Sequence, residues 1–128
     1  MMKFTVIVFL FFLTQNTYDI LPNIAYKNII DSDNKIILID VRSKQELDEI
    51  MINGVLNYDF NSDEFEKSIL SLDKEKTYYM ICRSGRRSGI TTELMLENGF
   101  ENVLNIKGGM IKWVESNLNL SIKKGHIK

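Results

Sequence analysis

One short segment of the chain combines the residue types that nucleophilic chemistry needs. Residues 82–88 read CRSGRRS, and the first of them, Cys82, is the only cysteine in the sequence. The only histidine, His126, lies beside the C-terminus and is a poor candidate for a general base. The thiolate is the reactive form of cysteine, and neighbouring positive charge favours it over the thiol. We therefore expect Cys82 to be a nucleophile that its surroundings activate without a base.

Arginine is concentrated in the same segment. Of the four arginines in the chain, three lie there, whereas the twelve lysines are spread along the sequence. A guanidinium binds an oxyanion through two parallel hydrogen bonds, which lysine cannot reproduce. Arg83, Arg86 and Arg87 therefore predict a site for a doubly charged oxyanion of sulfur or phosphorus. The alternative is that these arginines are solvated and that Cys82 is a small buried apolar residue.

The other residues of the segment suit a loop between a strand and a helix. Such a loop turns several backbone N–H groups toward its centre, and these groups, together with the helix dipole, favour a bound anion. Gly85 allows the sharp turn that the loop needs, and Ser84 and Ser88 lie on either side of it. We expect residues 83–88 to bind the substrate and Cys82 to react with it.

The rest of the sequence predicts the elements that hold this loop. Residues 35–40 and 77–81 are apolar runs without polar alternation, which is typical of strands buried on both faces of a parallel sheet. Ser43 and Glu46 form a capping-box pattern that predicts a short helix as far as about residue 50. Further strands are expected at 55–58 and 102–106, and further helices from Ser62 to residue 72, at 87–98 and after Gly108 and Gly109. Because strands and helices alternate, we predict an α/β fold with a small, mostly parallel β-sheet and helices on both faces.

Length and composition limit the possible functions. The chain has 128 residues, which fits one domain, and its formal net charge of −1 gives no general attraction to nucleic acid or to acidic membranes. One cysteine and one histidine exclude an intramolecular disulfide and a Cys/His zinc site. We therefore expect a monomer that binds no nucleic acid, needs no metal or cofactor, and holds its anion at a local site.

The N-terminal residues differ from the rest of the chain. Lys3 precedes an apolar run at 4–13, in which Thr5 is the one polar residue, and polar residues follow at 14–17. A run of this length is short for a membrane-spanning helix but suits a secretory signal. We predict a signal peptide at residues 1–17, a domain at residues 18–128, and export to the periplasm. The alternatives are a buried first strand and an uncleaved membrane anchor.

The loop motif resembles that of a known family. Its residues resemble the C-x-S-G-x-R-S active-site loop of the rhodanese (thiosulfate sulfurtransferase) family, in Cys82, Ser84, Gly85, Arg87 and Ser88. This resemblance implies a two-step reaction in which Cys82 attacks the outer sulfur of thiosulfate and sulfite leaves. The resulting persulfide would then pass its sulfur to an acceptor, which is cyanide or a thiol, including a thiol of a partner protein.

Two further elements support the resemblance. Residues 39–42 with Glu46 resemble the family's D-V-R-x-x-x-E element, and residues 108–113 resemble its G-G-x-x-x-W element. The resemblance covers residues 23–118, which fits a single-domain, exported member. One departure is visible, because the family's G-H-I-P-G-A-x-N turn is replaced by IMINGVLN at 50–57. The missing histidine puts a loop contact in doubt but not the nucleophile.

Some residues of these elements have more than one interpretation. The resemblance implies that the three arginines of the loop orient the sulfonate, and that Asp40, Arg42 and Glu46 support the site. A structural ion pair is the preferred interpretation of these supporting residues. Trp113 is expected in the core, because a lone tryptophan on an amphipathic helix is more often packed than exposed to a substrate.

Two other functions fit parts of the motif. A cysteine phosphatase or arsenate reductase needs an arginine six positions after the cysteine, where this chain has Ser88, and Arg87 comes one position earlier. The shorter loop fits a sulfur atom bound to Cys82 better than a phosphoryl group. The other function is that of a carrier, which holds the persulfide for a partner protein, and the sequence does not separate it from a transferase.

Overall fold

The computed structural model describes residues 18–123. They form a five-stranded sheet with the strand order β1-β5-β4-β2-β3, in which every pairing is parallel. In chain order the elements are β1 (Asp19–Ile20), α1 (Pro22–Asp31), β2 (Ile36–Asp40), α2 (Lys44–Glu49), β3 (Leu56–Asn57), α3 (Phe65–Leu70), β4 (Thr77–Ile81), α4 (Arg86–Glu97), β5 (Asn102–Ile106) and α5 (Gly109–Glu115). The predicted α/β fold with a parallel sheet is therefore confirmed.

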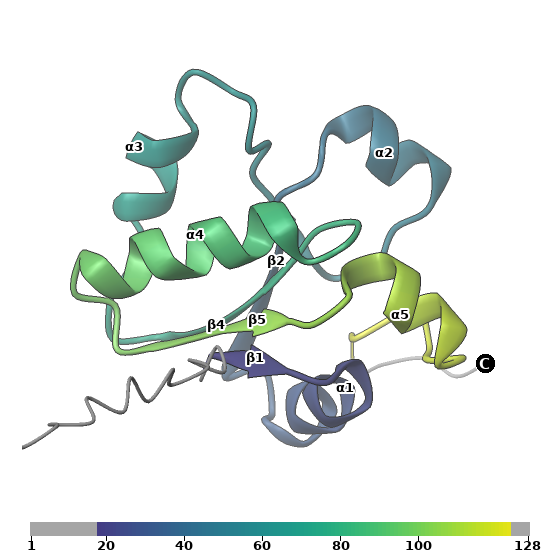
Figure 1. Cartoon of the computed structure of the whole chain (residues 1–128). Helices are drawn as coiled ribbons and strands as arrows, with labels where there is room; N and C mark the ends of the chain where they lie inside the picture. Colours follow the sequence, from purple (N-terminus) through teal and green to yellow (C-terminus); the bar gives the residue numbers. More distant parts are fainter. Residues whose placement is uncertain (1–17, 124–128) are drawn as a thin grey trace, which may run out of the picture.

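The helices cover both faces of the sheet (Figure 1). On the face of α1 and α5, Ala25 and Trp113 lie in one buried cluster with Leu38 of β2. On the face of α3 and α4, Met95 lies in a second cluster with Ile39. Successive side chains of a strand point to opposite faces, so Leu38 and Ile39 enter different clusters. Trp113 is completely buried, as the sequence predicts.

The carboxyl ends of two neighbouring inner strands, β2 and β4, meet at one edge of the sheet. β2 and β4 pair in register, with Asp40 opposite Ile81. The next residues along each strand, Val41 and Cys82, therefore emerge side by side, and the helices that follow, α2 and α4, begin at the same edge. Ligands of open α/β sheets bind outside the carboxyl ends of the strands, so this edge is where a site is expected.

Two parts of the fold differ from the prediction. The helix expected from Ser62 begins only at Phe65, because Ser62 is used in a turn. Its carbonyl accepts from the N–H of Phe65 at 3.1 Å, and its Oγ accepts from the N–H of Glu64 at 3.3 Å. The N-terminal part also differs, because the sequence patterns predict neither β1 nor α1, although Pro22 at the first turn of α1 is a recognised signal of a helix start.

The predicted signal peptide at residues 1–17 and the single histidine, His126, lie outside the described residues. Between residues 18 and 123, no helix has the length and apolar character that a membrane crossing requires. The same part of the chain contains no group of three or more His, Cys, Asp or Glu side chains arranged to hold a metal ion.

Candidate functional site

The thiol of Cys82 lies at the tip of β4, and its side chain is completely buried. Its Sγ accepts two hydrogen bonds, one from the N–H of Gly85 at 3.1 Å and one from Oγ of Ser88 at 3.2 Å. The residue also belongs to the apolar cluster beneath α4. Hydrogen bonds to an ionised acceptor are stronger than those to a neutral one, so both donors favour a sulfur anion. The surroundings of Cys82 therefore differ from those of an inert core cysteine.

The first turn of α4 adds to this preference for negative charge. Gly85 precedes the helix in the left-handed region, at φ 98°, which glycine adopts without strain. Its carbonyl accepts from the N–H of Gly89 at 3.0 Å, the first hydrogen bond of the helix. The amides at 86–88 are therefore the unsatisfied N–H groups of a helix N-terminus, which attract anions. The sulfur lies beside this positive end of α4.

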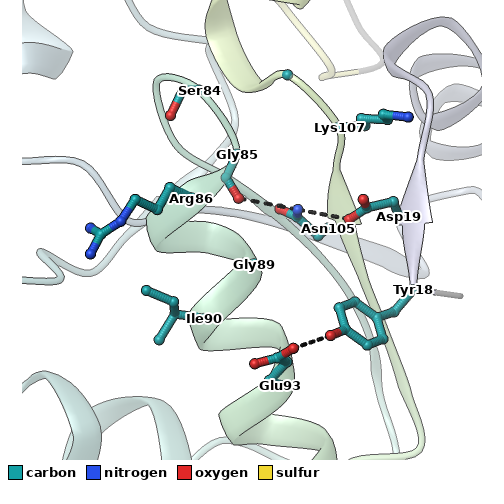
Figure 2. Close-up of a pocket in the computed structure, with 11 residues that line it drawn as sticks. Tyr18, Asp19, Ser84, Gly85, Arg86, Gly89, Ile90, Glu93, Asn105 and Lys107 are labelled. Carbon is teal, nitrogen blue, oxygen red and sulfur yellow. Dashed lines mark hydrogen bonds between the residues drawn. The ribbon is translucent and has the colours of Figure 1, made fainter. Parts of the chain in front are cut away.

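The three arginines of the loop do not converge on one point. Arg87 donates from both terminal nitrogens to the carboxylate of Glu46, at 2.7 and 2.9 Å. Arg83 is exposed and lines a cavity of about 410 Å³ together with Arg42 and residues of α5. Arg86 is exposed and lines a separate cavity of about 290 Å³ (Figure 2). The structure thus engages Arg87 in an ion pair and places Arg83 and Arg86 beside different cavities.

A buried ion pair lies behind the loop. Asp40 is 0% and Arg42 is 3% exposed, and Nε and Nη2 of Arg42 donate to the Asp40 carboxylate at distances of 2.8 to 3.1 Å. Arg42 also donates to the carbonyls of Glu46 and Ile50, at 3.4 and 2.8 Å. Asn57 completes the arrangement by donating to the carbonyls of Asp40 and Arg42. This pair fixes α2, and therefore Glu46, relative to the end of β2.

The start of α5 holds the backbone of the loop. The amides of Met110 and Ile111 donate to the carbonyls of Cys82 and Arg83, at 2.8 and 3.2 Å. Gly109 makes this approach possible, because a Cβ there would lie 2.3 Å from the carbonyl oxygen of Cys82 and 2.6 Å from that of Arg83. The loop is therefore supported from the last helix as well as from β4 and α4.

Comparison with known proteins identifies this arrangement. A family model described as the rhodanese-like domain matches residues 22–116. The chain belongs to this family. YtwF of Bacillus subtilis, which is provisionally named a sulfurtransferase, is 38% identical to this rhodanese-like chain over 89 residues, covering 70% of the chain and 84% of YtwF.

Two further relatives agree with the assignment. YrkF of Bacillus subtilis, provisionally named a sulfur carrier protein, is 36% identical over 89 residues, covering 70% of this chain and 47% of YrkF. The match therefore spans about half of that protein. The crystal structure of a rhodanese-related protein from Thermoplasma volcanium has a TM-score of 0.68 and 27% identity, covering 78% of this chain and 93% of that one. By homology, the rhodanese-like chain is a member of a family of sulfurtransferases and sulfur carriers.

Three polar residues around the rhodanese-like loop were missed in the sequence. Asn57 holds the end of β2, and Asp19 and Asn105 form hydrogen bonds beside Gly85. Asn105 interrupts the otherwise apolar end of β5, and a buried polar side chain is retained only where it finds a partner. A polar residue in this apolar strand end is therefore the sequence signal that could have identified Asn105.

The ion pair of Arg87 controls the ionisation of Glu46. Hydrogen bonds from Arg87 lower the pKa of Glu46 from 4.5 to about 2, and contacts with Ser43 act in the same direction while burial opposes them. A carboxylate whose pKa is lower in the folded state stabilises the fold above its unfolded pKa. This contribution is therefore present at neutral pH and is lost as the pH falls from 4.5 toward 2.

We expect Glu46→Gln to lower the free energy of unfolding at neutral pH by about 1 kcal/mol, because the pair is partly exposed to solvent. The difference from the unmodified protein should narrow as the pH falls below 4.5. Urea unfolding across this pH range measures it, and Asp48→Asn on the exposed side of α2 is the matched control. A difference that does not change with pH would show that the ion pair is not its source.

Proposed function

We propose that this protein is a thiosulfate sulfurtransferase whose nucleophile is Cys82. In the first step the thiolate attacks the outer sulfur of thiosulfate, the S–S bond breaks, and sulfite leaves with its electron pair. In the second step an acceptor, cyanide or a thiolate, attacks the outer sulfur of the persulfide, which restores the Cys82 thiolate. The observation that carries the proposal is the position of Sγ at the N-terminus of α4, where Gly85 and Ser88 donate to it.

The hydrogen bonds around the sulfur support both charged states of this cycle. Each charge-assisted hydrogen bond contributes about 1.5 to 3 kcal/mol, and two are already directed at Sγ. In the persulfide the negative charge moves one bond outward, to the added sulfur. The free amides of the first turn, at 86–88, supply donors for that atom. A general base is not required at any step.

Arg83 and Arg86 suit the capture of a dianion. Both side chains are exposed, and neither forms an ion pair with another described residue. Exposed positive charge near a site raises the rate at which an anion meets it, and salt weakens the effect. We assign these two residues to the approach of thiosulfate and the departure of sulfite, and Arg87 to holding the loop against Glu46.

Intact-mass spectrometry tests the proposal directly. The purified protein, incubated with thiosulfate and then freed of it, should gain the mass of one sulfur atom, and peptide mapping should place that atom on Cys82. Added cyanide should remove the extra mass and release an equal amount of thiocyanate. Because the chain has a single cysteine, the absence of any mass gain at high thiosulfate concentration would contradict the proposal.

A persulfide carrier for a partner protein is the second candidate function. The relative YrkF, which carries the name of a sulfur carrier, supports it. A carrier would gain the sulfur but keep it in the presence of cyanide or small thiols. The rate of thiocyanate release in the same experiment therefore separates the two functions.

A further inference from the structure

We propose that Asn105 is a positioning residue that keeps the N–H of Gly85 directed at the sulfur of Cys82. Asn105 lies in β5, the strand beside β4, and is 5% exposed. Its Nδ2 donates to the carbonyl of Gly85 at 3.2 Å and to Oδ1 of Asp19 at 2.9 Å (Figure 2). The consequence for turnover rests on the proposed sulfur transfer, whereas the geometry stands without it.

Gly85 is the point at which Asn105 acts on the sulfur. The N–H of Gly85 donates to Sγ of Cys82, and its carbonyl accepts from Asn105. Only the φ and ψ angles of this one residue separate the two groups, so fixing the carbonyl restricts the direction of the N–H. Glycine has more backbone freedom than any other residue. The N–H of Gly89 and the amide of Asn105 both donate to the Gly85 carbonyl, and Asn105 is the contact from outside α4 that restricts Gly85 at φ 98°.

Asp19 determines which end of the Asn105 amide faces the loop. The two residues are register partners in the neighbouring strands β1 and β5. Because both partners of Nδ2 are oxygen acceptors, a flipped amide would place Oδ1 against two oxygens. The carboxylate of Asp19 therefore holds the amide nitrogen in the orientation that contacts Gly85.

The unsatisfied oxygen of Asn105 argues against a role in stability alone. Oδ1 is buried and has no hydrogen-bond partner among residues 18–123. A buried acceptor without a partner costs free energy, and an apolar side chain of similar size would avoid that cost. The chain instead has an amide at this position. Its nitrogen donates to the carbonyl of Gly85, and the N–H of Gly85 donates to Sγ of Cys82. Figure 2 shows this connection from β1 through β5 to the start of α4.

Alkylation by iodoacetamide tests the proposal, because Cys82 is the only cysteine and is therefore the only thiol observed. In Asn105→Leu the donor to Gly85 is lost while the branched shape and the number of heavy atoms of the side chain are kept. We expect alkylation at neutral pH to be about tenfold slower, since one charge-assisted hydrogen bond to the thiolate is weakened. The rise of the alkylation rate with pH should move to higher pH. No charged side chain around the loop is replaced in this variant, although Asp19 loses its hydrogen bond from residue 105. The groups that are kept are Arg83, Arg86, Arg87, Glu46, Asp40, Arg42, Asp19, Glu93 and Lys107.

Asn102→Leu is the matched control, because it makes the same change at the exposed start of the same strand. Asn102→Leu should leave the alkylation rate of Cys82 and its dependence on pH unchanged. If Asn105→Leu lowers the thermal unfolding midpoint but leaves the profile unchanged, Asn105 is only structural and the proposal is overturned.

Asp19→Leu provides a second test should Asn105→Leu fail to fold. Asp19 is on the edge strand β1 and is only partly buried, and its loss frees the Asn105 amide to turn. Loss of the carboxylate by itself favours the thiolate and would speed alkylation. Slower alkylation therefore identifies the loss of the Asn105 orientation, and a rate that is unchanged or higher overturns the proposal. Alkylation needs no sulfur donor, so its outcome is separate from the outcome of the thiosulfate experiment.

Discussion

Replacement of Cys82 by serine is expected to abolish sulfur transfer, with a fall in kcat/KM for thiosulfate of about 10⁴-fold or more. A serine hydroxyl is not ionised at neutral pH, and its oxygen does not form a stable bond to the transferred sulfur. The hydrogen bonds from Gly85 and Ser88 can be made to Oγ of serine as well as to Sγ. The variant should therefore fold normally. Thiocyanate release measures its sulfur transfer, and circular dichroism measures its folding.

Ser88→Ala provides the graded comparison for this result. It keeps the nucleophile and removes one of the two donors to Sγ, so we expect kcat/KM to fall by about 10- to 100-fold, the value of one charge-assisted hydrogen bond. Sulfur transfer that survives in Cys82→Ser would place the nucleophile elsewhere and end the proposed mechanism. Equal losses in the two variants would show that Ser88 acts on the fold of the loop.

Replacement of Arg42 by methionine is expected to cost about 3 to 5 kcal/mol of folding stability, because it leaves the buried carboxylate of Asp40 without its partner. Asp40 would keep only the backbone N–H of residue 42 as a donor. The carbonyl of Ile50 would also lose its donor. For a domain of this size the loss corresponds to a fall of more than about 10 °C in the unfolding midpoint, measured by calorimetry.

Two further variants establish the cause of that loss. In Asp40→Leu combined with Arg42→Met, no buried charge is left without a partner, so the double variant should be more stable than Arg42→Met alone. Lys112→Met breaks the exposed ion pair with Glu115 and should leave the midpoint nearly unchanged. If the double variant is no more stable than Arg42→Met, the uncompensated carboxylate is not the source of the loss.

Local sequence patterns were sufficient to predict the elements that surround the loop. The runs at 35–40 and 77–81 lack polar alternation because both faces of β2 and β4 are covered by helices, and that feature is visible in one sequence. The pattern of Ser43 and Glu46 predicted α2, and both hydrogen bonds of the capping box are present. These features depend on residues that are close along the chain.

Contacts between distant residues could not be predicted in the same way. Arg87 meets Glu46 across 41 positions, and Asn105 meets Asp19 across 86. Which of several charges or amides come together depends on the order of the strands in the sheet, and no local pattern encodes that order. The sequence therefore indicated three arginines for the substrate, whereas the structure engages Arg87 in an ion pair with Glu46.

The contacts between α5 and the loop make the shape of the loop depend on a segment that follows it in the sequence. The carbonyls of Cys82 and Arg83 are held by the amides of Met110 and Ile111, which the ribosome adds well after the cysteine. A polypeptide that ends before these residues lacks both donors to the loop carbonyls. The loop therefore gains these two supporting hydrogen bonds only when a segment almost thirty positions downstream of it has folded against the sheet.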